Sequence, residues 1–127
     1  MIPTVLTLLL AASSPSSEDA GAATLEEGFL HHVFFWLKEP ENEQARKEFL
    51  SALEEIKKIP TIRRWYVGTP AGTPRDVVDN SWTFYWLVTF KDEAGWRVYN
   101  EHPIHEEFRK KAYLWEKVLV YDIVPVR

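Results

Sequence analysis

The sequence contains no cysteine, which excludes disulfide bonds, thiolate zinc sites and cysteine nucleophiles. It also lacks an excess of basic residues, because 15 Lys and Arg stand against 19 Asp and Glu, for a formal charge of −4. Surfaces that track nucleic-acid phosphates are basic, so the composition argues against nucleic acid as a partner. No glycine-rich phosphate loop is present, and nothing in the sequence indicates nucleotide binding.

The N-terminal apolar run, residues 5–12, is too short to span a membrane as a helix. A stretch rich in Ser, Pro and Ala follows it to Thr24, and Ala20-Gly21-Ala22 resembles a signal-peptidase site, although no Lys or Arg precedes the apolar run. Residues 1–24 are therefore predicted to be a signal peptide or a disordered leader. The first alternative predicts export to the periplasm or the extracellular space, and the second a cytoplasmic protein.

Residues 27–127 carry the pattern of one globular domain. Alternating aromatic and β-branched residues predict strands, and a 3.6-residue apolar spacing predicts helices. The expected elements are a strand over Phe29–Leu37, a helix over 41–58, strands over 62–67 and 81–90, a helical region over 93–116 broken near His102, and a strand over 117–124. This β-α-β-β-α-β order is typical of the ferredoxin-like α+β fold, with one four-stranded antiparallel sheet and two helices on one face.

Both faces of the first strand are apolar. His32, Phe34 and Trp36 lie on one face, and His31 lies on the other with Val33, Phe35 and Leu37. Since helices can cover only one face of the sheet, a second copy of the chain is expected to cover the other, giving a homodimer whose two sheets form an α/β barrel. We expect His32 to face the pocket and His31 to face the interface.

The segment 98–108 concentrates groups capable of acid/base chemistry. Pro103 suits the first position of a helix, so His102 is the expected cap and His105 lies in the first turn. The positive end of the helix dipole favours a neutral His105, whereas Glu106 and Glu107 act in the opposite direction. His105 is thus a candidate general base. The alternative is that Tyr99 and the two histidines only cap the helix and pack at its foot.

Four motifs stand out over about residues 29–125: His31-His32-Val-Phe-Phe, the strand Phe84–Phe90, Tyr99-x-x-His-Pro-x-His105, and Val118-Leu-Val-Tyr-Asp122. Together they resemble the stress-responsive A/B barrel (Dabb) domain. The resemblance implies a dimeric α/β barrel.

A characterised plant cyclase of this family performs an aldol condensation without an organic cofactor. The resemblance implies catalytic roles for Tyr99, His105, His32 and Asp122, with Asp122 orienting the catalytic histidine, and no cofactor. The substrate-binding residues expected to line a small apolar pocket are Trp36, Phe49, Leu53, Trp86 and Phe108. The pocket walls differ from those of the cyclase, and its substrate is not transferred to this chain.

Three functional classes stay open. The first is an enzyme acting on a small carbonyl, polyketide-like substrate, whether cyclase- or lyase-like or monooxygenase-like. The second is a non-catalytic dimeric module that binds an apolar or aromatic ligand or serves a structural role. The third is a metal site of His and Asp groups, which the spacing of the four histidines does not favour. The sequence does not decide whether the chain is an enzyme. In the alternative interpretation of each site residue, the histidines are core or capping groups and the aromatic residues fill the core.

Overall fold

The computed structural model describes Pro3 and residues 27–127, and the predicted leader lies outside them. The elements in chain order are β1 (Phe29–Leu37), α2 (Glu43–Ile56), β2 (Arg64–Gly68), β3 (Phe84–Phe90), α3 (Glu93–Glu101), α4 (Pro103–Arg109), a 3-10 turn (Ala112–Leu114) and β4 (Trp115–Ile123). The sheet has the order β2-β3-β1-β4, and every neighbouring pair is antiparallel. The predicted ferredoxin-like α+β fold is confirmed.

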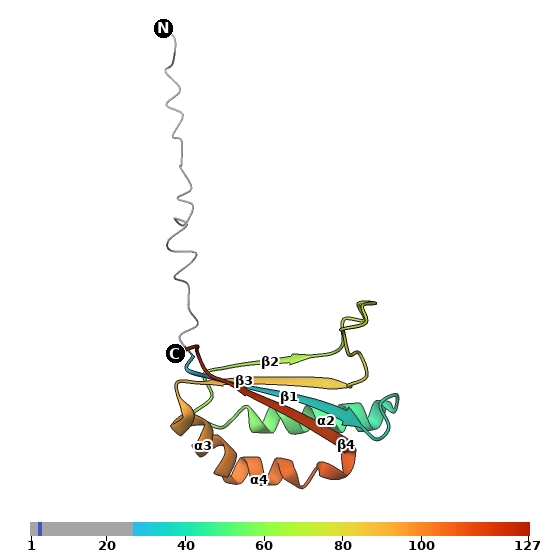
Figure 1. Cartoon of the computed structure of the whole chain (residues 1–127). Helices are drawn as coiled ribbons and strands as arrows, with labels where there is room; N and C mark the ends of the chain where they lie inside the picture. Colours follow the sequence, from blue (N-terminus) through green and yellow to red (C-terminus); the bar gives the residue numbers. More distant parts are fainter. Residues whose placement is uncertain (1–2, 4–26) are drawn as a thin grey trace.

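The α-helices lie on one side of the sheet (Figure 1). In α2, Asn42 caps the first turn by accepting a hydrogen bond of 2.9 Å from the Ala45 N–H. The apolar residues of α2 then recur at helical spacing and bury one face against the sheet; they are Phe49, Ala52, Leu53 and Ile56. This face explains why α2 is stable as a surface helix.

Three expected boundaries are wrong. The strand expected over 81–90 begins only at Phe84, and the Thr83 hydroxyl just before it accepts a hydrogen bond of 3.0 Å from the Leu37 N–H. The helical region expected over 93–116 ends at Arg109, and β4 begins at Trp115, two residues before the expected start. The break at His102 was expected, and it occurs where His102 takes an extended conformation ahead of Pro103.

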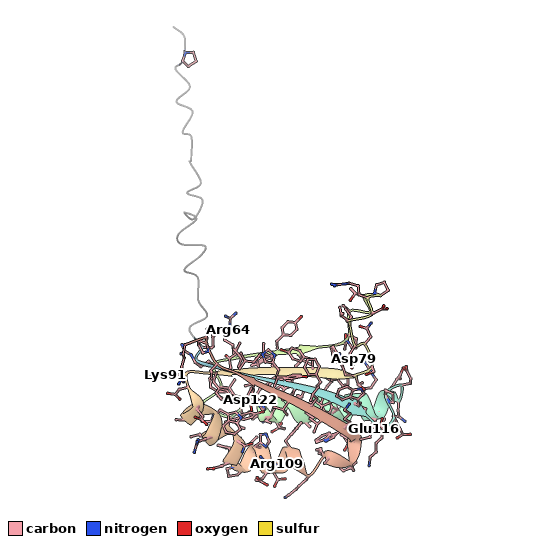
Figure 2. The ribbon with its side chains drawn as sticks, in the orientation of Figure 1. Arg64, Asp79, Lys91, Arg109, Glu116 and Asp122 are labelled. Carbon is pink, nitrogen blue, oxygen red and sulfur yellow. The ribbon has the colours of Figure 1, made fainter. Side chains whose placement is uncertain are left out.

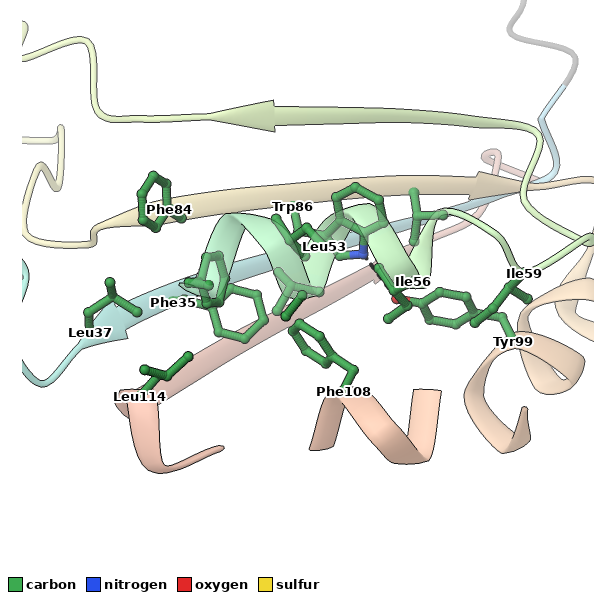
Figure 3. Packing of buried hydrophobic residues seen from close by; sticks show 14 of the residues in the cluster. Phe35, Leu37, Leu53, Ile56, Ile59, Phe84, Trp86, Tyr99, Phe108 and Leu114 are labelled. Atoms are coloured by element: carbon green, nitrogen blue, oxygen red, sulfur yellow. Dashed lines mark hydrogen bonds between the residues drawn. The ribbon is translucent and has the colours of Figure 1, made fainter. Parts of the chain in front are cut away.

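The core fills the space between the sheet and the helices (Figure 3). From β1 it takes alternate residues, each at most 8% exposed: Phe29, His31, Val33, Phe35 and Leu37. The intervening residues of β1 lie on the other face of the sheet and are only half-buried; they include His32 and Trp36. The expected orientation of β1 is therefore wrong: His31 faces the helices, and His32 faces away from them.

We call the side of the sheet away from the helices the open face. Residues paired across neighbouring strands share a face, so the register assigns to it Leu30, His32, Phe34, Trp36, Tyr66, Tyr85, Leu87, Leu119, Tyr121 and Ile123. Several of these are large apolar side chains in contact with solvent, among them Tyr66 at 62% exposed and Tyr121 at 55%. No described helix covers this face (Figure 1).

Within the part of the chain that the structure describes, no helix is long and apolar enough to cross a membrane.

Candidate functional site

The break between α3 and α4 brings a phenol and an imidazole together. Tyr99 lies in the last turn of α3 and His105 in the first turn of α4, and their ring centroids are 4.8 Å apart in an edge-to-face arrangement. His102 caps α4 as expected, because its Nδ1 accepts a hydrogen bond of 3.1 Å from the Ile104 N–H. Arg109 fixes the two short helices, since it donates to the Asn100 carbonyl on α3 at 2.8 Å and pairs with Glu106 on α4.

A histidine and an aspartate from the sheet complete the cluster. His31 on β1 and Asp122 on β4 are cross-strand partners, and His31 Nδ1 lies 2.5 Å from Asp122 Oδ1. A carboxylate can only accept a hydrogen bond, so the proton of this bond resides on Nδ1. In the neutral imidazole, Nε2 then carries the lone pair and can act as an acceptor. The His31 and Tyr99 ring centroids are 5.7 Å apart. Asp122 was expected to orient His105, and the residue that it contacts is His31.

The environment of His105 favours the neutral imidazole. Burial is the main cause, and the nearby Arg109 guanidinium adds to it, lowering the pKa of His105 to about 4. The direction is the one expected from the sequence, but burial rather than the helix dipole is its main cause. The buried Nδ1 of His105 has no hydrogen-bond partner among the described residues. His105 is thus a neutral group with an unused ring nitrogen.

The hydroxyl of Tyr99 is buried and partly satisfied. The side chain is 1% exposed, and its oxygen accepts a hydrogen bond of 2.9 Å from Trp86 Nε1. Burial raises the pKa of the Tyr99 phenol well above its usual value, and the Trp86 hydrogen bond opposes this change. Tyr99 is therefore a protonated phenol near neutral pH, suited to donate a hydrogen bond.

The edge of the sheet beside this cluster is open to solvent. Val118 and Val120 pair with the helix-facing Phe35 and Val33, yet they remain 46% and 43% exposed. Asp122, two residues further along β4, is also exposed on this side. Figure 2 shows Asp122 on the sheet and Arg109 on the helix layer. The solvent-exposed members of this edge are thus Val118, Val120 and Asp122.

His32 and Trp36 lie outside the cluster, because both are on the open face. His32 Nδ1 is 2.5 Å from the Tyr85 hydroxyl, and burial lowers the pKa of His32. Its Nε2 has no partner among the described residues. Trp36 donates from Nε1 to the Ser81 hydroxyl at 2.9 Å. The sheet separates these two residues from Tyr99, His105 and Asp122, so the structure does not bring all the predicted site residues together.

Most of the predicted pocket lining is packed core. Phe49, Leu53 and Trp86 are each at most 1% exposed (Figure 3). Phe108 instead borders a groove of about 330 Å³ between α2 and α4, whose other lining residues are Ala52, Glu55, Ile104, Glu107 and Lys111. The five residues therefore do not form one pocket wall in this structure.

In the described part of the chain, no group of three or more His, Cys, Asp or Glu side chains is placed so that it could hold a metal ion.

The fold and the His/Asp/Tyr cluster together define a ferredoxin-like α+β domain with a small set of acid/base groups between sheet and helices. Residues 29–125 match the model of the stress responsive A/B barrel domain, and the chain therefore belongs to this family. The sequence matches no curated protein.

Solved structures of the same fold cover most of the described chain. A Dabb family protein from Mesorhizobium loti is 27% identical, with a TM-score of 0.66 over 78% of this chain and 97% of that one. A hydroxynitrile lyase from Passiflora edulis is 21% identical, with a TM-score of 0.68 over 80% and 96%. A dimeric ferredoxin-like protein of unknown function from Thermobifida fusca is 17% identical, with a TM-score of 0.64 over 78% and 92%.

His31 is the residue that sequence reasoning assigned to the wrong side. A signal was available in the alternation of β1, since His31 shares its face with Phe29, Val33, Phe35 and Leu37, whereas the face of His32 ends in the amphipathic Trp36. The more uniformly apolar set is the one that the helices cover.

Proposed function

We propose that this protein catalyses proton transfer on a small carbonyl compound without an organic cofactor, in the cluster of His31, Asp122, Tyr99 and His105. The observation that carries the proposal is the short His31–Asp122 hydrogen bond beside a buried phenol. An oriented imidazole can remove a proton α to a carbonyl, while a phenol donates to the oxygen on which negative charge develops.

His31 is the better general base of the two histidines in the cluster. When a base accepts a proton it becomes an imidazolium, and Asp122 at 2.5 Å stabilises that cation. His105 has no carboxylate in this position, and burial and Arg109 hold its pKa at about 4, which makes it a weak base at neutral pH. We assign to His105 the role of a neutral hydrogen-bond partner for the substrate, through its unused ring nitrogen.

The substrate class follows from these groups. The cluster offers one oriented base and one protonated phenol, which suits a carbonyl or a hydroxyl compound in equilibrium with a carbonyl. A structural neighbour is named a hydroxynitrile lyase. Cleavage of a hydroxynitrile yields a carbonyl when a base takes the hydroxyl proton, the bond between the carbinol carbon and the nitrile carbon breaks, and cyanide leaves and is protonated to hydrogen cyanide. We therefore choose an aromatic hydroxynitrile and a simple aryl ketone as test substrates.

The test compares two adjacent histidines on opposite faces of β1. Exchange of the α-protons of the ketone with D2O is followed by NMR, and aldehyde release from the hydroxynitrile by ultraviolet absorbance, for the wild type, His31→Gln and His32→Gln. Loss of a positioned base lowers rates by about 10²- to 10⁴-fold, so His31→Gln is expected to lose at least 100-fold and to lose far more than His32→Gln. Equal effects of the two variants would contradict the proposal.

A non-catalytic binding module is the second candidate, supported by the groove between α2 and α4. Its floor is apolar, with Ala52, Ile104 and Phe108, and its rim carries Glu55, Glu107 and Lys111. Saturable binding of a fluorescent apolar probe that Ile104→Glu abolishes, together with no turnover in any variant, would favour this function.

We also propose that the protein is a homodimer whose two open faces pack together as a barrel. The open face exposes large apolar groups, including Leu119, Tyr121 and Ile123, which a stable monomer rarely leaves in water. Neighbours of this fold from Thermobifida fusca, Bacteroides fragilis and Jannaschia are each described as dimeric. In this arrangement His32 and Trp36 would belong to the interface.

A further inference from the structure

We infer that Trp86 is a positioning residue for Tyr99: its indole N–H occupies one side of the Tyr99 oxygen and directs the phenolic proton toward the substrate. This inference rests on the proposed function, since it assigns Trp86 a part in that reaction. Trp86 acts through Tyr99 and is not itself proposed to contact the reacting atoms.

The hydrogen bond joins the two layers of the fold. Trp86 lies on β3 and Tyr99 on α3, and Nε1 is 2.9 Å from the hydroxyl oxygen (Figure 3). Both side chains are only 1% exposed, so water does not compete for either group. The indole N–H can only donate, and the hydroxyl must therefore be the acceptor in this bond.

Because the Tyr99 oxygen is the acceptor in this hydrogen bond, the phenolic proton is left available. No acceptor for it is found among the described residues, where Trp86 is the hydrogen-bond partner of the Tyr99 hydroxyl. The rings around Tyr99 belong to His31, Phe90 and His105, so the Tyr99 ring lies within the acid/base cluster. When Tyr99 donates to a substrate oxygen and its own oxygen becomes more negative, the indole N–H stabilises that charge in a dry environment.

Trp86 packs against a second tryptophan on the same side of the sheet. Its ring stacks on Trp65 with centroids 6.4 Å apart and planes 25° apart. Lys57 Nζ lies 3.5 Å from the Trp65 ring centroid on this edge of the sheet. A donor packed in this way costs little reorganisation during a reaction, which is the condition for positioning a catalytic group.

The competing explanation is that Trp86 only fills the core. Trp86→Phe separates the two explanations, because it removes the N–H and keeps an aromatic ring in the core. Trp65→Phe is the matched control: Trp65 is a neighbouring tryptophan on the same side of the sheet, and the Tyr99 hydroxyl is bonded to Trp86 and not to Trp65.

The kinetic experiment is a double-mutant cycle on the full chain. For ketone proton exchange, Trp86→Phe is expected to lower kcat about five- to tenfold with KM changed less than twofold, because one hydrogen bond that strengthens in the transition state is lost. In the Tyr99→Phe background the same substitution should change kcat less than twofold. Independent, multiplicative effects of the two substitutions would overturn the inference.

An NMR measurement separates failure of this inference from failure of the proposed function. If Tyr99→Phe leaves proton exchange unchanged, the proposed function fails. The NMR signals then decide the inference: the Trp86 indole N–H signal should move in Tyr99→Phe, and the Tyr99 13Cζ signal should move in Trp86→Phe but not in Trp65→Phe. Unchanged signals would show that the indole does not position the phenol, and would overturn the inference whether or not the protein is active.

Discussion

Replacing His105 with Phe is expected to reduce the loss of stability that the protein suffers in mild acid. In the folded protein the pKa of His105 is about 4, whereas a solvated histidine has 6.5. As the pH falls from 6.5 to 4, the unfolded chain binds a proton at this position and the folded chain does not, so stability falls with pH. Above pH 6.5 both states are neutral and His105 causes no pH dependence.

The size of the effect follows from the same pKa difference. Each unit of pKa corresponds to about 1.4 kcal/mol, so the titration of His105 can lower the free energy of unfolding by at most about 3 kcal/mol. His105 is only partly buried, and solvent screening reduces the expected value to about 1 to 2 kcal/mol. The Phe ring can keep the edge-to-face contacts that His105 makes with Tyr99 and Phe108, and the change should therefore remove the titration with little loss of packing.

Urea unfolding at pH 7 and pH 4.5, at one fixed protein concentration, measures this difference. The wild type should lose about 1 to 2 kcal/mol more than His105→Phe between the two pH values. His102→Asn is the control, because Asn is also a good helix cap and the substitution leaves the buried His105 in place. The reasoning is refuted if His105→Phe loses as much stability in acid as the wild type does.

Two further predictions use residues with matched controls. Phe49→Ala should lower the free energy of unfolding by about 3 to 5 kcal/mol, because Phe49 is fully buried, whereas Leu50→Ala on the exposed side of α2 should cost less than about 1 kcal/mol; similar losses in urea unfolding would contradict the core assignment. Leu119→Lys on the open face should shift sedimentation toward the monomer, and Leu50→Lys, equally exposed at 38% against 37%, should not; a monomeric wild type at micromolar concentration would disprove the dimer.

Local signals in the sequence predicted much of the fold correctly. The order of strands and helices follows from period-2 and 3.6-residue patterns, which depend only on neighbouring residues. The break at His102-Pro103 was equally predictable, because proline at the first helical position and a capping side chain are local features. The start of β3 was less predictable, since strand pairing joins residues that are distant in the sequence, as the hydrogen bond between Leu37 and Thr83 illustrates.

The candidate site was harder to predict, because it depends on which face of β1 the helices cover. Side chains alternate along a strand, so an error of one residue moves every side chain to the opposite face. Both faces of β1 are apolar and each carries one of two adjacent histidines, so the two faces differ only by the more uniformly apolar set around His31. The pairing of His31 with Asp122 depends in addition on the register of β1 and β4, which a single sequence does not provide.

The two histidines of the cluster occupy opposite electrostatic environments. His31 is hydrogen-bonded to a carboxylate at 2.5 Å, whereas burial and Arg109 disfavour a proton on His105. When two titratable groups of one site have environments that differ in this way, one group is ready to accept a proton while the other stays neutral. The unpartnered buried Nδ1 of His105 costs free energy that a polar partner would recover, so a purely structural role gives no reason for this group. The proposed role of His105 as a hydrogen-bond partner for the substrate supplies one.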